Sequence, residues 1–137
     1  MFQKEKPTAL IIKSFILGWG MVLCYTIFNS YGALVLKNQV QKLGTWNFTT
    51  AMSYFSYFRS LFSSFQTWLG LGAIGVATGA WIIALANLEL SRAYPIAIGL
   101  NLLIIVGSSF IHFHEPLTLS KIIGIGLILC GVVVLFR

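Results

Sequence analysis

Four long stretches of this chain contain no Asp, Glu, Lys or Arg, and their lengths restrict what the chain can fold into. The stretches are Ser14–Leu36, Ser60–Leu88, Ala93–Ile111 and Ile122–Phe136. A helix needs about 20 apolar residues to cross a bilayer, and the fourth stretch reaches that length if Lys121 snorkels from its first turn. Only 9% of the residues are charged, whereas soluble domains average about 25%. The sequence therefore predicts an integral membrane protein.

The expected fold is all-α, a four-transmembrane-helix bundle that forms one membrane domain over residues 1–137. The expected spans are residues 9–36, 67–88, 93–113 and 117–136. Four glycines in the second span permit close approach of a neighbouring helix and predict a packing face. These glycines are Gly70, Gly72, Gly75 and Gly79.

An additional helix is expected between the first two spans, over residues 48–65. Its phenylalanines recur at helical spacing, and serines together with Arg59 occupy polar positions between them. This amphipathic pattern predicts an interfacial helix that lies at the membrane surface. Aromatic packing against the neighbouring spans would leave a similar stripe, so that alternative stays open.

The titratable residues give little support to enzymatic, metal or nucleic-acid chemistry. The acidic residues are Glu5, Glu89 and Glu115. All three fall at expected interfaces or tails, so no buried carboxylate pair is expected for acid–base catalysis. His112 and His114 lie two residues apart and do not face the same way on a helix. The basic residues are scattered over helix ends without a basic stripe. We therefore expect no catalytic residue, no metal, no cofactor and no nucleic-acid partner.

The polar residues within and beside the spans predict a site for an anionic headgroup. The candidate substrate-binding residues are Asn29, Lys37, Tyr94, Asn101, His114 and Glu115. Amides bond to sugar hydroxyls, and a lysine serves as a point charge for phosphate. In the alternative interpretation, Asn29 and Asn101 only form interhelical hydrogen bonds and Lys37 only snorkels.

Three short motifs resemble the four-span branch of the drug/metabolite transporter superfamily, which includes the small multidrug resistance transporters. Gly32 followed five residues later by Lys37 resembles the end of that family's first helix. Ala93–Ile96 resembles its A-Y-x-I opening of the third helix, and Ile122–Gly124 with Gly131 resembles its dimerisation stretch in the fourth. The resemblance implies a dimer, and we expect Gly124 and Gly131 to lie at its interface.

A more extensive resemblance is to the small subunits of the aminoarabinose–phosphoundecaprenol flippase. The motifs that carry it are Trp68–Leu71, Ala93–Pro95, Leu100–Asn101 and His114–Pro116, in the same order and at near-identical spacing. The resemblance covers about half the chain. It implies a subunit in the bacterial inner membrane, as a homodimer or paired with a related small subunit, that translocates a polyprenyl-phosphate-linked sugar or similar amphiphilic anion.

Two departures from the small multidrug exporters argue against cation/proton antiport. The family's carboxylate in the first span, eight residues before the lysine, is Asn29 here, and an amide neither titrates nor neutralises a cation. The family's substrate-contacting tryptophan is Ala97 here. Two alternatives to a flippase remain: a small-molecule exporter with another coupling group, and a non-transporting accessory subunit of envelope glycan assembly.

Overall fold

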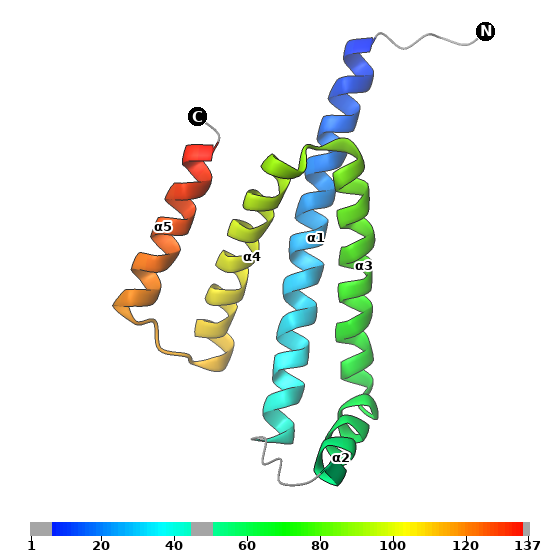
Figure 1. Cartoon of the computed structure of the whole chain (residues 1–137), viewed down its shortest axis with the longest axis vertical. Helices are drawn as coiled ribbons and strands as arrows, with labels where there is room; N and C mark the ends of the chain where they lie inside the picture. Colours follow the sequence, from blue (N-terminus) through cyan, green and yellow to red (C-terminus); the bar gives the residue numbers. More distant parts are fainter. Residues whose placement is uncertain (1–6, 45–50, 136–137) are drawn as a thin grey trace, which may run out of the picture.

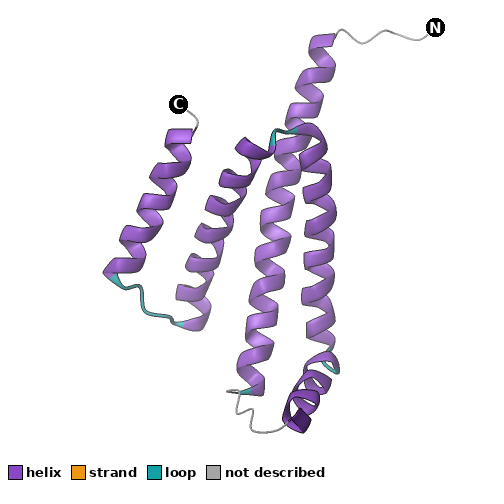
Figure 2. Cartoon of the chain, in the orientation of Figure 1, coloured by secondary structure: helices purple, strands orange, loops and turns teal. Residues whose placement is uncertain are grey.

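The computed structural model describes residues 7–44 and 51–135, and every regular element in these ranges is an α-helix (Figures 1 and 2). The helices are α1 (Pro7–Leu43), α2 (Ala51–Phe62), α3 (Phe65–Asn87), α4 (Leu90–Phe113) and α5 (Leu119–Leu135). The all-α prediction is confirmed.

Within the described residues, three helices are long and apolar enough to cross a membrane. They contain the candidate spans Ile12–Leu43, Phe65–Asn87 and Leu90–Phe113. Helix α5 is equally apolar but only 17 residues long, so the fourth span stays a prediction. A helix does lie within the expected segment 48–65, namely α2, although its place at a membrane surface also remains a prediction.

Helix α1 continues seven residues beyond the expected end of the first span at residue 36. Lys37 and Lys42 therefore lie on the helix rather than in a loop. A charged side chain marks where an apolar span can end, but lysine is a good helix former and does not stop the backbone. The helix ends at Gly44, whose φ of +83° is the left-handed conformation that glycine adopts readily at helix C-termini.

Helices α1 and α3 form the tightest pair in the structure, and small residues make their contact. The buried positions of α3 are Thr67, Gly70, Ala73, Ala77, Ala80 and Ala84. At Gly32 of α1, an added Cβ would lie 2.7 Å from the Gly70 carbonyl oxygen. By contrast, Gly72, Gly75 and Gly79 have no atom of another described helix within 4 Å of such a Cβ. Of the four glycines expected on a packing face, only Gly70 lies in this contact.

Large apolar side chains cover the outside of the bundle, while its interior is built from small ones. Ile16 is 65% exposed and Ile82 is 64% exposed, whereas the fully buried side chains of largest volume are Val22, Thr26, Thr67 and Ser30. Lipid tails solvate such an exterior, and close packing of small residues holds membrane helices together. This inverted distribution of side-chain size suits a bilayer environment.

The four long helices stand in a row, in the order α5, α4, α1 and α3, with α2 folded against the lower end of α3 (Figure 1). Thr67 Oγ1 donates to the Leu61 carbonyl at 2.6 Å and Trp68 Nε1 donates to the Phe62 carbonyl at 2.9 Å, which fixes the α2–α3 corner. Among the described helices, α5 packs against α4 alone. The row therefore leaves one edge of the bundle, at α5, weakly held.

Candidate functional site

A groove of about 470 Å³ runs between α4 and α5. Its walls are the apolar side chains of Leu102, Ile105, Val106, Phe110, Ile125 and Ile128. Its lower end is lined by Lys37, Glu115 and Lys121, which we call the charged mouth. The groove thus joins an apolar trough, long enough for part of an acyl or prenyl chain, to a small charged cluster.

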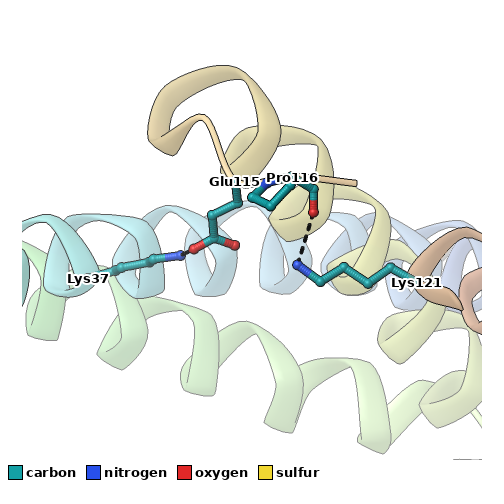
Figure 3. Close-up of polar contacts among 4 residues, drawn as sticks. All are labelled: Lys37, Glu115, Pro116 and Lys121. Atoms are coloured by element: carbon teal, nitrogen blue, oxygen red, sulfur yellow. Dashed lines mark hydrogen bonds and ion pairs between the residues drawn. The ribbon is translucent and has the colours of Figure 1, made fainter. Parts of the chain in front are cut away.

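The charged mouth brings together residues from α1, the α4–α5 connection and α5 (Figure 3). Lys37 Nζ donates a hydrogen bond to Glu115 Oε1, forming an ion pair whose side chains are 34% and 41% exposed. Lys121 Nζ donates to the Pro116 carbonyl oxygen at 3.2 Å. Two lysines and one carboxylate therefore converge at one end of the groove, with a net charge of +1.

The backbone after α4 turns sharply, and this turn directs Glu115 toward α1. His114 ends α4 with φ 50° and ψ 33°, a left-handed conformation, and the amides of His114 and Glu115 both donate to the Ser109 carbonyl. A left-handed conformation costs a non-glycine residue roughly 1 kcal/mol. Lys37 also lies 4.5 Å from the centroid of the Phe113 ring, so its ammonium contacts both the last helical residue and the connection.

The charge on Glu115 is set by its lysine neighbours. The hydrogen bond from Lys37 lowers the pKa of the Glu115 carboxyl below its ordinary value; partial desolvation opposes this, and the charges of Lys37 and Lys121 add to the lowering. The carboxylate therefore stays ionised throughout the neutral range.

We expect the stabilising effect of this ion pair to persist from pH 8 to pH 5 and to disappear in acid. Because the folded-state pKa of Glu115 is lowered, its contribution is present above the ordinary value of 4.5 and is lost as the pH falls through the lower folded value. The measurement is the difference in Tm between the wild type and Glu115→Gln in detergent at several pH values. A difference that grows toward acid pH would contradict the assignment.

A second polar cluster lies between α1 and α4. Asn101 Oδ1 accepts hydrogen bonds from Ser30 Oγ at 2.8 Å and from Asn29 Nδ2 at 3.4 Å. Ser30 is fully buried, and Asn29 precedes Lys37 by eight residues, about 12 Å along a helix. The interhelical hydrogen bond expected in the alternative interpretation of Asn29 and Asn101 is thus present. It lies farther along α1 from the charged mouth, toward the middle of the bundle.

Tyr94 lies apart from both clusters. Its ring is 6.0 Å from that of Trp81, which in turn is 4.8 Å from the ring of Tyr25. Nineteen residues of α4 separate Tyr94 from Phe113, about 28 Å along the helix. The structure therefore unites Lys37 with Glu115 and Asn29 with Asn101, and it leaves Tyr94 in an aromatic cluster at the opposite end. His114 is exposed and supplies the turn.

Two residues of these clusters, Ser30 beside Asn101 and Lys121 in the charged mouth, were not singled out from the sequence as site residues. Ser30 follows Asn29 and was visible only as part of a polar run. Lys121 was expected merely to snorkel, and its position shortly after the His114–Pro116 motif was the available signal. Within residues 7–44 and 51–135, no group of three or more His, Cys, Asp or Glu residues is placed to hold a metal ion.

Comparison with known proteins identifies subunits of a flippase among the relatives of this chain. The chain is 39% identical over 70 residues to a probable 4-amino-4-deoxy-L-arabinose-phosphoundecaprenol flippase subunit ArnE of Hamiltonella defensa, covering 50% of this chain and 62% of that protein. It is 33% identical over 81 residues to the probable ArnE subunit of Pseudomonas syringae, covering 58% of this chain and 74% of that protein. The chain belongs to the family of these small flippase subunits.

The chain is also similar to a subunit of a second type. A probable ArnF subunit of Pseudomonas fluorescens is 36% identical over 64 residues, which cover 46% of this chain and 47% of that protein. The chain thus spans 62% of the length of the Hamiltonella defensa relative and 47% of the length of the Pseudomonas fluorescens relative. No family model and no solved structure matches it. Family membership and three apolar helices together make it a multi-pass membrane protein.

Proposed function

We propose that this protein is one subunit of a flippase in the bacterial inner membrane and that it translocates a polyprenyl-phosphate-linked sugar or a similar amphiphilic anion. The observation that supports this most directly is the α4–α5 groove, because its two parts match the two parts of such a lipid. The apolar walls suit a prenyl chain, and the charged mouth suits a phosphate, for which lysines act as point charges. Relatives named as flippase subunits support the same activity.

In this proposal the prenyl tail stays in the bilayer along the groove while the headgroup enters between α1 and α4. Lys37 binds the phosphate at the mouth, and the amides of Asn29 and Asn101 bond to sugar hydroxyls deeper in the bundle. Asn101 has amide hydrogens to offer while its oxygen accepts from Asn29 and Ser30. A headgroup moving by this route exchanges water for amide and lysine partners, which lowers the desolvation penalty.

The proposed flippase works as a dimer, either with a second copy or with a related small subunit. Helix α5 crosses the membrane as the fourth span, and α2 lies at the membrane surface. Gly131 is exposed and Gly124 lines the groove; neither has an atom of another described helix within 4 Å of an added Cβ. A partner helix seated on this glycine face would close the open side of the groove and place the headgroup path at the subunit interface.

Replacing Lys37 or Asn101 with alanine is expected to reduce headgroup translocation by about tenfold or more, without unfolding the protein. The assay follows a fluorescent undecaprenyl-phosphate-linked sugar in proteoliposomes, quenched from outside by an impermeant reductant. The protein is reconstituted with any subunit that co-purifies with it. A tenfold loss in flux corresponds to about 1.4 kcal/mol of transition-state stabilisation, which is about the contribution of one hydrogen bond from Asn101 or one charge-assisted contact from Lys37.

Two matched variants test whether removing a lysine or an asparagine outside the proposed path also reduces flux. Lys42→Ala removes a lysine at the same end of α1 that donates to Gln66 Oε1 at 3.1 Å, and Asn87→Ala removes an amide that bonds to the Ile83 carbonyl in its own helix. Both should leave flux within about twofold of the wild type. Unchanged flux in both Lys37→Ala and Asn101→Ala would refute the proposed path.

A further inference from the structure

One face of α2 lines a depression of about 510 Å³ that the proposed headgroup path does not use. Positions three or four residues apart share a face of a helix. The residues that line the depression have this spacing, and all of them are exposed: Met52, Phe55, Ser56, Arg59, Ser60 and Ser63. We call this surface the Arg59 face. It combines one guanidinium and three hydroxyls with two large apolar side chains.

The guanidinium of Arg59 has no partner within the described part of the chain. Three lysines lie at the same end of the bundle, and each donates a hydrogen bond to an oxygen of another residue: Lys37, Lys42 and Lys121. Arg59, by contrast, makes no hydrogen bond or ion pair with a described residue. Glu115 is the one carboxylate at this end of the described chain, so the end carries a net charge of +3. An anion is therefore the complementary ligand for the Arg59 face.

The neighbouring face of α2 is aromatic, and it indicates where such an anion lies. The rings of Phe58 and Phe62 are stacked at 6.5 Å, and the ring of Phe62 is 6.0 Å from that of Trp68 at the start of α3. These exposed rings suit the boundary between lipid tails and headgroups. Because a helix turns by about 100° per residue, Arg59 lies about 60° around α2 from Phe62. With the rings among the tails, Arg59 is at the level of the lipid phosphates.

We propose that the Arg59 face of α2 is a binding site for the headgroup of an anionic phospholipid. The planar guanidinium matches a phosphate with two parallel hydrogen bonds. The hydroxyls of Ser56 and Ser63 can donate to phosphate oxygens. Ser60 Oγ donates to the Ser56 carbonyl at 3.0 Å and so accepts from a headgroup hydroxyl. The apolar side chains of the face contact the upper part of the acyl chains.

This inference rests on one part of the proposed function, the place of α2 at the membrane surface (Figure 1). It concerns a bulk lipid of the bilayer and a surface outside the α4–α5 groove. A lipid bound there would hold α2 at the headgroup level by a polar contact as well as by its aromatic rings. The two contacts are independent, so the site can be removed without removing the rings.

The test uses full-length protein in nanodiscs of phosphatidylcholine. Two photoreactive probe lipids, a phosphatidylglycerol and a phosphatidylcholine, carry the same diazirine beside the ester of one acyl chain. After irradiation, mass spectrometry of proteolytic peptides locates the label, which distinguishes lipid at α2 from lipid at the charged mouth. The phosphatidylglycerol probe should label α2 at least about fivefold more, because its phosphate has no cation of its own to compete with Arg59.

Arg59→Gln should lower labelling of α2 by the phosphatidylglycerol probe to the level of the phosphatidylcholine probe. Arg59→Lys keeps the charge but loses the planar fork, so its labelling should be intermediate. Lys42→Gln is the matched control, because it removes one positive charge from the same end of the bundle, outside the Arg59 face. It should keep at least half of the wild-type preference.

The outcomes separate this inference from the proposed function. Equal labelling of α2 by the two probes, or a preference that survives in Arg59→Gln, would overturn the site while leaving α2 at the membrane surface. An equal loss in Lys42→Gln and Arg59→Gln would replace the site with a general attraction to the positive end. If neither probe labels α2, its place at the membrane surface is wrong and the site fails with it, whereas flux through the groove is measured separately. A preference that depends on Arg59 alone supports the site.

Discussion

Replacing Gly32 with alanine is expected to destabilise the protein by about 1–3 kcal/mol, the usual effect of overpacking a close contact. A Cβ at this position would lie 2.6 Å from Ile74 Cγ1 and 2.7 Å from the Gly70 carbonyl oxygen. The isoleucine side chain has some freedom to move, but the carbonyl belongs to the α3 backbone. Helices α1 and α3 must therefore separate, and the contact that organises the bundle loosens along its length.

The matched control is Gly20→Ala, which makes the same chemical change in the same helix. Gly20 has no atom of another described helix within 4 Å of an added Cβ, and alanine is the better helix former by roughly 0.5–1 kcal/mol. Unfolding is followed by circular dichroism of purified protein in mixed detergent micelles as the denaturing detergent is increased. Equal stability of the two variants would show that the Gly32–Gly70 approach is not a close contact in solution.

The Gly32–Gly70 contact illustrates what the sequence predicts and what it does not. The glycines of α3 were expected to mark a packing face, and the face that contacts α1 is instead defined by the spacing of Gly70 with Ala73, Ala77, Ala80 and Ala84. Gly72, Gly75 and Gly79 fall on other sides of the helix, because a helix turns by about 100° per residue. The presence of glycine indicates only that another helix can approach closely. The side of α3 on which it does so is indicated by the spacing of all the small residues, alanines included.

The helices themselves were predictable because apolar length is a local property of the sequence. The end of α1 was not, since Lys37 limits an apolar span but does not stop a helix, and the actual stop is Gly44 with its positive φ. An interhelical hydrogen bond by Asn29 and Asn101 was one of the two interpretations of the sequence, but the pairing of Lys37 with Glu115 was not foreseen. Lys37 and Glu115 are 78 residues apart, and only the left-handed turn at His114 brings the carboxylate back to α1.

The second large effect is expected from reversing the charge of Lys37. Lys37→Glu places two carboxylates where the ion pair stood and leaves Lys121 as the nearest lysine of the charged mouth. We expect flux of an undecaprenyl-phosphate-linked sugar to fall by at least about tenfold, because the two carboxylates repel each other and repel the incoming phosphate. The α4–α5 connection should also lose its attachment to α1, and a lower Tm would report that loss.

The double variant Lys37→Glu with Glu115→Lys restores an ion pair in which the two charges have exchanged positions. It therefore distinguishes the effect of having an ion pair from the effect of having lysine at position 37. The swap keeps a carboxylate and two lysines in the mouth, so Tm should return to near the wild-type value and flux should recover in part. Lys42→Glu, which changes the same charge near the end of α1 but outside the groove, should leave flux nearly unchanged. Recovery of Tm without any recovery of flux would mean that Lys37 must act from α1 itself. Exchanging two side chains that contact each other directly should restore their interaction. Failure to recover either Tm or flux would therefore contradict the Lys37–Glu115 contact.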